Sequence, residues 1–196
     1  MIEFEVKGIT LRFSFLFFAM LTAVFLIDKT GTAVLCVIAC GLHELGHIVA
    51  FFLLGLKPSG LNFELSGIRL TKQNQIIPYK KELVVLAAGC AVNFIIVGVL
   101  GVCNIPQFDT FRGINLTLGI FNILPIGELD GGRILKLSLL LKATPNRAFG
   151  VAKIVSIVFI LPIVFAGIVS LISLNNITLL ITGVYLAMML FGREQL

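Results

Sequence analysis

Two histidines and a glutamate lie close together in an apolar stretch of the chain. They form the run His43-Glu44-Leu45-Gly46-His47, and the sequence contains only these 2 histidines. On a helix, residues four apart share one face about one turn apart, so both imidazoles can reach the same metal ion. In a His-Glu-x-x-His pattern the histidines hold Zn²⁺, and the glutamate stays off the metal as a general base for an attacking water.

Chance is a poor explanation for this run. Such short patterns do arise by coincidence on solvated helices, where His and Glu are ordinary surface residues. Here the three residues fall within the apolar run 31–56. Ionisable groups are rare at membrane depth and mark a functional site by default. We therefore expect His43 and His47 to bind metal and Glu44 to act as the base.

Two cysteines offer an alternative ligand set, because Cys36 and Cys40 fall on the same helix face as the histidines. With a rise of about 1.5 Å per residue, Cys36 lies about 16 Å along the helix from His47, far beyond one coordination sphere. Cys40 could accompany His43 only by excluding His47. We expect both cysteines to serve as small apolar residues, and the chain's 4 cysteines imply no disulfide framework.

A catalytic zinc typically takes a third protein ligand from His, Asp or Glu. Glu128 and Asp130 are the distant acids available, and both fall in the apolar run 114–141, which Pro125 and several glycines interrupt. Non-helical backbone at membrane depth survives only where protein buries it or it lines a cavity. Gly131 and Gly132 would let backbone approach closely there. The broken run is therefore a site candidate, with Glu128 and Asp130 both open as the third ligand.

The elements that must position these residues have the composition of a membrane protein. Hydrophobic residues make up 58% of the 196 positions and charged residues 13%, more apolar surface than a soluble globule can bury. Apolar runs fall at 11–27, 31–56, 83–103, 114–141, 149–173 and 176–191. We expect an all-α polytopic membrane protein with about six transmembrane helices, the fourth of them broken. Residues 1–196 would form a single integral-membrane domain whose first helix is retained, not a cleaved signal peptide.

The basic residues indicate topology. With six passes and the N-terminus inside, Lys29 and Arg112 lie outside, and the other 13 of the 15 Lys and Arg lie inside or near the inner end of a span. Both termini are therefore expected to face the cytoplasm. The net charge of +5 indicates contact with anionic lipid, and we expect no nucleic-acid partner.

The longest polar connection, 57–82, contains an alternating segment over about 61–70. Leu61, Phe63 and Leu65, then Ile68 and Leu70, alternate with polar neighbours, which predicts a short cytoplasmic β-hairpin. Its edge could accept an extended peptide as an added strand. A surface turn that merely connects two helices is the alternative, and the sequence leaves both open.

Three separated elements together resemble the site-2 protease family of intramembrane zinc metalloproteases. The first is His43-Glu44-Leu45-Gly46-His47, and the second is Asn122 and Pro125 followed by Leu129-Asp130-Gly131. The third is Ala88-Gly89-Cys90-Ala91-Val92-Asn93, which looks like the family's Ala-Gly-x-x-x-Asn element. Their order and their placement on separate apolar runs match the family's pattern.

The resemblance implies roles for individual residues. His43, His47 and Asp130 would be ligands of one Zn²⁺, and Glu44 would be the catalytic base. Asn122 would lie near the substrate backbone.

Asn93 is a weaker candidate. It could stabilise an oxyanion, or it could be a packing residue bonded to a neighbouring helix. Many relatives have proline where Cys90 stands and another just before the Leu-Asp pair, where this chain has Ile126-Gly127-Glu128. Neither departure removes a ligand, although Glu128 could compete for the ion or help relay protons.

The function implied by this resemblance is hydrolysis of a peptide bond in or near a transmembrane or membrane-associated segment of a substrate protein. The layout is similar to the sporulation branch of the family, found in spore-forming bacteria, which cleaves a membrane-associated precursor of a transcription factor. This similarity implies a bacterial cell membrane and a regulatory membrane partner. A membrane zinc transporter or metal-binding protein is the alternative, but it would not need Glu44, and the sequence shows no convincing internal repeat. A third possibility is an inactive scaffold that binds membrane partners.

Overall fold

A computed structural model describes residues 2–6, 9–56, 58–64, 67–72, 77–127 and 129–192. The chain divides into two compact units, Met1–Gly119 and Ile120–Leu196, which we call the N-terminal and C-terminal units. Helix α4 (Asp109–Ile123) crosses the boundary between them. The broad expectation of a predominantly helical chain is confirmed.

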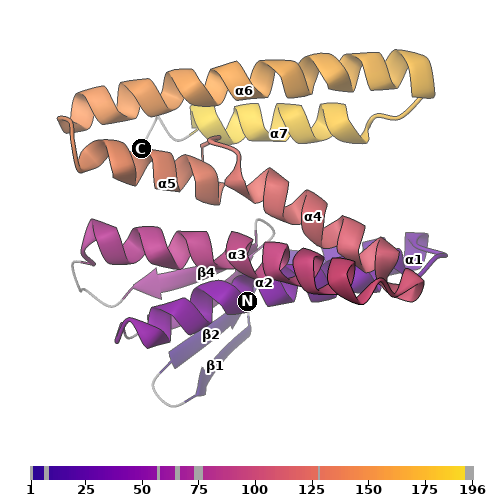
Figure 1. The fold of residues 1–196 in the computed structure, drawn as a ribbon, viewed down its shortest axis with the longest axis horizontal. Helices are drawn as coiled ribbons and strands as arrows, with labels where there is room; N and C mark the ends of the chain where they lie inside the picture. The colour runs from indigo at the N-terminus through magenta and orange to yellow at the C-terminus, as the bar shows by residue number, and fades with distance from the viewer. Residues whose placement is uncertain are drawn as a thin grey trace. The chain divides into compact units, whose positions relative to one another are not determined.

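The N-terminal unit combines helices with a four-stranded sheet (Figure 1). Before α4 its helices are α1 (Phe15–Ile27), α2 (Thr32–Leu53), α3 (Tyr79–Cys103) and the short 3-10 helix η1 (Pro106–Phe108). Its strands are β1 (Ile2–Val6), β2 (Ile9–Phe13), β3 (Pro58–Glu64) and β4 (Gly67–Lys72).

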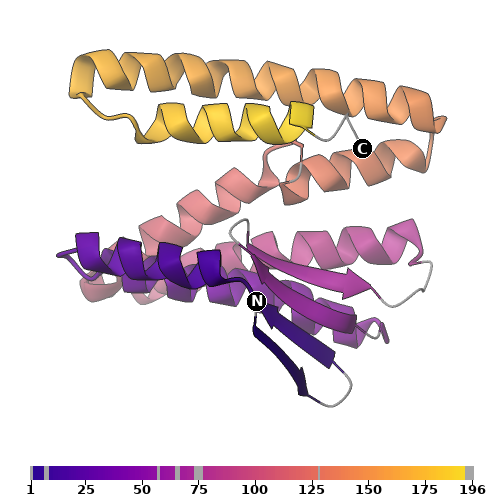
Figure 2. The ribbon, with the colours of Figure 1, turned by 180° about the vertical axis from the view of Figure 1, so that it is seen from behind.

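The strands follow the order β1-β2-β3-β4, and Figure 2 shows them side by side. β1 and β2 are antiparallel, with Phe4 opposite Leu11, and β3 and β4 are antiparallel, with Leu61 opposite Leu70. The central pair is parallel and places Leu11 opposite Leu61. Parallel neighbours need a long crossover connection. Helices α1 and α2 supply it, so the sheet joins the start of the chain to the segment after the histidine-bearing helix.

Strands β1 and β2 were not predicted from the sequence, which indicated β-structure only in the hairpin over about 61–70. The apolar run that begins at residue 11 predicted helix, but residues 11–13 belong to β2, and α1 begins only at Phe15. The reason is the period-two alternation of Ile2, Phe4 and Val6 with Glu3 and Glu5, which is typical of a strand. A strand needs neighbours, and β3 provides the pairing partner for β2.

Small residues let α2 and α3 pack closely. A Cβ atom added at Gly46 would lie 2.8 Å from the Ala88 carbonyl oxygen and 2.8 Å from Val92 Cγ2. Alanine at this position would therefore push the two helices apart. Buried side chains beside the contact form a cluster of Ala50, Phe51, Leu56, Ile77 and Val85.

The C-terminal unit contains three helices after α4. They are α5 (Asp130–Leu140), α6 (Pro145–Leu174) and α7 (Thr178–Gly192). Helices α6 and α7 lie side by side (Figure 1), and glycines on both allow close contact. A Cβ atom at Gly167 would lie 2.6 Å from Leu180 Cα, and one at Gly183 would lie 2.8 Å from Val164 Cγ2.

Among the described residues, 3 helices are long and apolar enough to cross a membrane: Thr32–Leu53, Tyr79–Cys103 and Pro145–Leu174. Thr178–Gly192 is a shorter apolar helix. Large apolar side chains along α6 are exposed, such as Phe165 at 69% and Ile172 at 79%. A long helix with this much exposed apolar surface suits a lipid environment, as expected for an integral membrane protein.

Candidate metal centre

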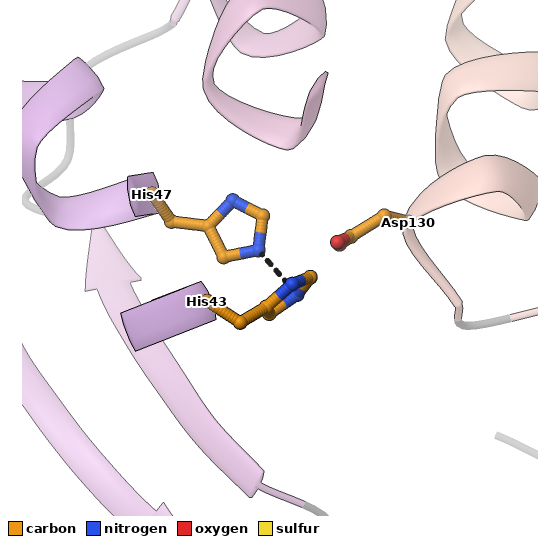
Figure 3. A group of neighbouring side chains, drawn as sticks. All are labelled: His43, His47 and Asp130. Atoms are coloured by element: carbon orange, nitrogen blue, oxygen red, sulfur yellow. Dashed lines mark hydrogen bonds between the residues drawn. The ribbon is translucent and has the colours of Figure 1, made fainter. Parts of the chain in front are cut away.

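The two histidines lie on one face of α2, and both are buried, His43 at 5% and His47 at 7% exposure. Their rings meet edge to face (Figure 3). The ring centroids are 4.7 Å apart, and the two Nε2 atoms are 3.2 Å apart. The spacing of four residues therefore brings both Nε2 atoms to one point, as predicted from the sequence.

The other ring nitrogen of each histidine is held by α3. The Nδ1 atom of His43 lies 2.6 Å from Asn93 Oδ1, and the Nδ1 atom of His47 lies 2.8 Å from the Val85 carbonyl oxygen. Both partners are oxygens, which can only accept, so each Nδ1 atom donates its hydrogen to the partner on α3. In each ring, Nε2 is then the nitrogen left to bind a cation.

Gly89 on α3 makes room for these rings. A Cβ atom added there would overlap the Cε1 and Nε2 atoms of His47 and would lie 2.9 Å from His43 Cε1. Glycine is therefore required for steric reasons at this position of the Ala-Gly-x-x-x-Asn element, because no larger side chain fits against the two imidazoles.

Asp130 belongs to the C-terminal unit, where it begins α5 after a break in the helical backbone. Helix α4 ends at Ile123, and α5 begins at Asp130. Asp130 is 8% exposed, and a carboxylate in the first turn of a helix is stabilised by the helix dipole. The helix interruption predicted within the run 114–141 is therefore present, although a membrane span over this run remains a prediction.

Two glycines allow the backbone of the break to fold back closely. A Cβ atom at Gly131 would overlap the Ile123 carbonyl, and one at Gly132 would lie 2.5 Å from the Gly127 carbonyl oxygen. Gly127 itself has φ 42°, a left-handed conformation that favours glycine. Glycine at positions 127, 131 and 132 therefore lets the chain turn closely enough to place Asp130 at the start of α5.

The break is also held by Ser156 of α6, a residue that the sequence analysis did not single out. Its buried hydroxyl accepts from the Gly127 amide at 2.9 Å and donates to the Ala152 carbonyl at 2.8 Å, with the Pro125 carbonyl oxygen at 3.3 Å. A serine in an apolar helix is the one sequence signal that could have found it.

One group of potential metal ligands stands out among the described residues. His43, His47 and Asp130 each offer a ligand atom, and these atoms lie within 4.8 Å of one another (Figure 3). Two imidazoles and a carboxylate are the donor set of catalytic zinc sites. Nitrogens bound to one tetrahedral zinc at about 2.0–2.1 Å are separated by roughly 3.3 Å, close to the 3.2 Å between the Nε2 atoms. The donor set therefore fits Zn²⁺.

The remaining predicted residues lie as follows. Glu44 is half-buried on α2, next to His43, and Asn122 is half-buried in the last turn of α4. Asn93 is fully buried on α3. Cys36 and Cys40 are outside the ligand group, and Glu128 lies outside the described residues.

The sequence and fold have known relatives. Residues 101–165 match Peptidase family M50. A zinc metalloprotease of Methanocaldococcus jannaschii is 30% identical over 172 residues, which are 83% of this chain and 48% of that protein. This chain thus spans about half the length of that curated relative.

A solved structure extends the similarity to nearly the whole chain. The site-2 protease from Methanocaldococcus jannaschii superposes with a TM-score of 0.69 at 26% sequence identity, over 99% of this chain and 94% of the other. Sequence motif, family match and fold therefore agree in their similarity to site-2 proteases of the zinc metalloprotease class.

Proposed function

We propose that this chain is an intramembrane zinc metalloprotease that hydrolyses a peptide bond in or near a membrane segment of a substrate protein. The observation that carries the proposal is the pair of Nε2 atoms 3.2 Å apart, with both Nδ1 atoms committed to oxygen acceptors. His43, His47 and Asp130 would hold one Zn²⁺, which, when bound, supplies a Lewis acid that polarises the scissile carbonyl and acidifies water.

Glu44 would act as the general base. It directly follows the first histidine on α2, so its carboxylate can accept a proton from the attacking water and later deliver it to the leaving amine. Asn122, in the last turn of α4, would lie near the substrate backbone.

A transmembrane substrate presents a further physical problem, because all carbonyls of a helix are paired within the helix. The substrate must therefore unwind locally before attack. The antiparallel pair β3 and β4 supports a role for this segment in holding the unwound strand, since an extended peptide can add to a sheet edge.

The topology proposed from the charge distribution places both termini in the cytoplasm and gives about six spans. The 3 long apolar helices support a multi-pass arrangement, and an inward-facing site would receive water from the cytoplasm. Within the family, a substrate such as a membrane-associated transcription-factor precursor of sporulation fits this layout. A regulatory membrane partner and anionic lipid are the associated proposals.

The test is co-expression with a panel of tagged single-pass membrane proteins, comparing the wild-type chain with Glu44→Gln. We expect Glu44→Gln to abolish cleavage while zinc content, measured by atomic absorption, is retained, because Glu44 does not bind the metal. The matched control is Glu82→Gln, the same chemical change in the first turn of α3. Undiminished cleavage by Glu44→Gln would refute the mechanism, and zinc flux without proteolysis would favour a transporter.

The ligand set has its own test. His43→Ala and Asp130→Ala should each lower the zinc content of the purified protein, and Glu128→Ala should leave it unchanged. Zinc that stays bound in Asp130→Ala but is lost in Glu128→Ala would reassign the third ligand.

A further inference from the structure

Two asparagines extend the hydrogen bonding of His43 away from the metal. Asn93 on α3 and Asn115 on α4 are both 0% exposed. His43 Nδ1 lies 2.6 Å from Asn93 Oδ1, Asn93 Nδ2 donates to Asn115 Oδ1 at 2.9 Å, and Asn115 Nδ2 donates to the Phe111 carbonyl at 2.9 Å. All four residues belong to the N-terminal unit. They form one continuous chain of hydrogen bonds from a backbone carbonyl to an imidazole.

The direction of this chain is fixed at its far end. The Phe111 carbonyl can only accept, so Asn115 must present its NH₂ group to it and its oxygen to Asn93. Asn93 must then donate with its NH₂ group and turn its oxygen to His43. That oxygen requires a hydrogen on Nδ1, which leaves the Nε2 lone pair free.

His47 needs no such chain. Its partner is the Val85 carbonyl, a backbone oxygen that has no second orientation. The partner of His43 is a side-chain amide, and an amide can turn by 180° to offer a donor in place of an acceptor. With the amide of Asn93 reversed, the proton of His43 would move to Nε2 and block it as a ligand.

The packing of α3 and α4 favours this contact. A Cβ atom added at Gly119 would lie 3.1 Å from two ring atoms of Phe94 and 3.3 Å from Asn93 Cβ. The glycine therefore lets α4 approach α3 one turn beyond Asn115. Buried amides that close to each other are stable only when their donors and acceptors are matched.

We propose that Asn115 is a positioning residue: acting through Asn93, it fixes the Nδ1-protonated tautomer of His43 and so keeps Nε2 free to bind zinc. The inference rests on the zinc-ligand role of His43 in the proposed function and adds a residue on a third helix. It assigns Asn93 to the support of His43.

The test reads the tautomer directly in zinc-free protein. The chain has 2 histidines, so ¹⁵N-labelled histidine gives four ring signals. In the wild type, the signals of His43 should be those of the Nδ1-protonated tautomer. Asn115→Leu should give a mixture with the Nε2-protonated form and weaken zinc binding about 10- to 100-fold. Thr117→Val is the matched control, because this hydroxyl on the same helix bonds only to the Gly113 carbonyl in its own helix.

Two acidic variants separate polarity from packing. Asn115→Asp keeps an acceptor toward Asn93 whether or not it is protonated, so the tautomer and the zinc affinity should be retained. Asn93→Asp can direct a carboxylate to His43 without help from α4, so adding Asn115→Leu to Asn93→Asp should cost little further zinc affinity.

The outcomes decide the proposal. A wild-type tautomer of His43 in Asn115→Leu would overturn the proposal. It would also be overturned if Asn115→Leu lowered the zinc affinity equally in the wild-type background and in the Asn93→Asp background. Should Asn115→Leu fail to fold, a mixed tautomer in Asn115→Asp would overturn it instead, and a retained one would support it. The tautomer is measured without zinc or substrate, so it is independent of the cleavage assay. Absence of cleavage would refute the proposed protease activity, and the spectra would still decide the role of Asn115.

Discussion

The two compact units each carry candidate zinc ligands, but they support these residues in different ways. In the N-terminal unit, His43 and His47 lie inside an unbroken helix, α2, and their Nδ1 atoms are paired with oxygens of α3. In the C-terminal unit, Asp130 follows a break in the helical backbone, and its setting depends on main-chain groups held by Ser156. The first unit therefore pairs its imidazoles with acceptors on a neighbouring helix, whereas the second rearranges the backbone.

This difference reflects what each ligand needs in apolar surroundings. An imidazole has a second nitrogen that must be paired and that sets the tautomer, so a histidine ligand benefits from a fixed acceptor. A carboxylate has no tautomer to set, since both of its oxygens accept, but it gains from unpaired amides at a helix start. The comparison predicts that substitutions in the two units fail in different ways.

The largest effect is expected at Gly89, on the histidine side of the comparison. Gly89→Ala places a methyl group against both imidazoles, so the rings must move and zinc affinity should fall roughly 100-fold or more, beyond the range for outer partners of metal ligands. Isothermal titration with Zn²⁺ measures this loss.

Gly98→Ala is the matched control on α3, because a Cβ atom there meets nothing within 4 Å. It should bind zinc as the wild type does. Equal zinc affinities for Gly89→Ala and the wild type would show that α3 does not confine the imidazole rings at Gly89, which would contradict this prediction.

The next effect tests the aspartate side. Ser156→Ala removes the acceptor of the Gly127 amide, and a buried donor left without a partner costs about 1–3 kcal/mol. We expect lower stability, with faster exchange of the Ile126 and Gly127 amide hydrogens, while the exchange of α2 is unchanged. Denaturation monitored by hydrogen exchange measures both.

Ser173→Ala, on an exposed position of the same helix, serves as the control for serine loss. If Ser156→Ala loosened α2 as much as the break, the two units would not be supported independently.

The sequence predicted the parts of the site that depend on local pattern. The spacing of His43 and His47 fixes their common face on any helix, and Pro125 with its neighbouring glycines predicts the end of α4. Both features are properties of a short segment and need no knowledge of its partners. The same local reasoning would have found β1 from the alternation over residues 2–6.

The supporting residues depend on packing and could not be predicted in the same way. Several polar residues lie on α4, and only the approach of α3 selects Asn115 as the one that meets Asn93. Likewise, Ser156 supports the break only because α6 passes close to Gly127, which lies nearly 30 residues before Ser156 in the chain. A lone polar residue in an apolar run signals that a partner exists, but not which one.

The smallest effect is expected outside both polar sites, in the short loop between α1 and α2. The Asp28 carboxylate accepts from the Thr30 hydroxyl at 2.6 Å, from the Ala33 amide at 2.7 Å and from the Thr30 amide at 2.9 Å. These bonds, that of the Thr30 hydroxyl first, lower the pKa of Asp28 below its ordinary value. Because the folded state favours the carboxylate, its stabilisation is present above the ordinary carboxyl pKa and is lost as the pH falls through the lowered value.

Asp28→Asn should therefore lower the thermal unfolding temperature slightly at neutral pH, and the difference from the wild type should shrink as the solution is made acidic. Asp109→Asn, at the exposed start of α4 where Asp109 pairs with Arg112 at 3.1 Å, is the control for loss of one surface carboxylate. Unfolding scans at several pH values measure the difference. A difference that grew toward acid pH would mean that Asp28 is stabilised in its protonated form, which contradicts the three donors around it. A loop exposed to water replaces lost hydrogen bonds with solvent, so this carboxylate contributes less than the buried groups that hold His43 and the break before Asp130.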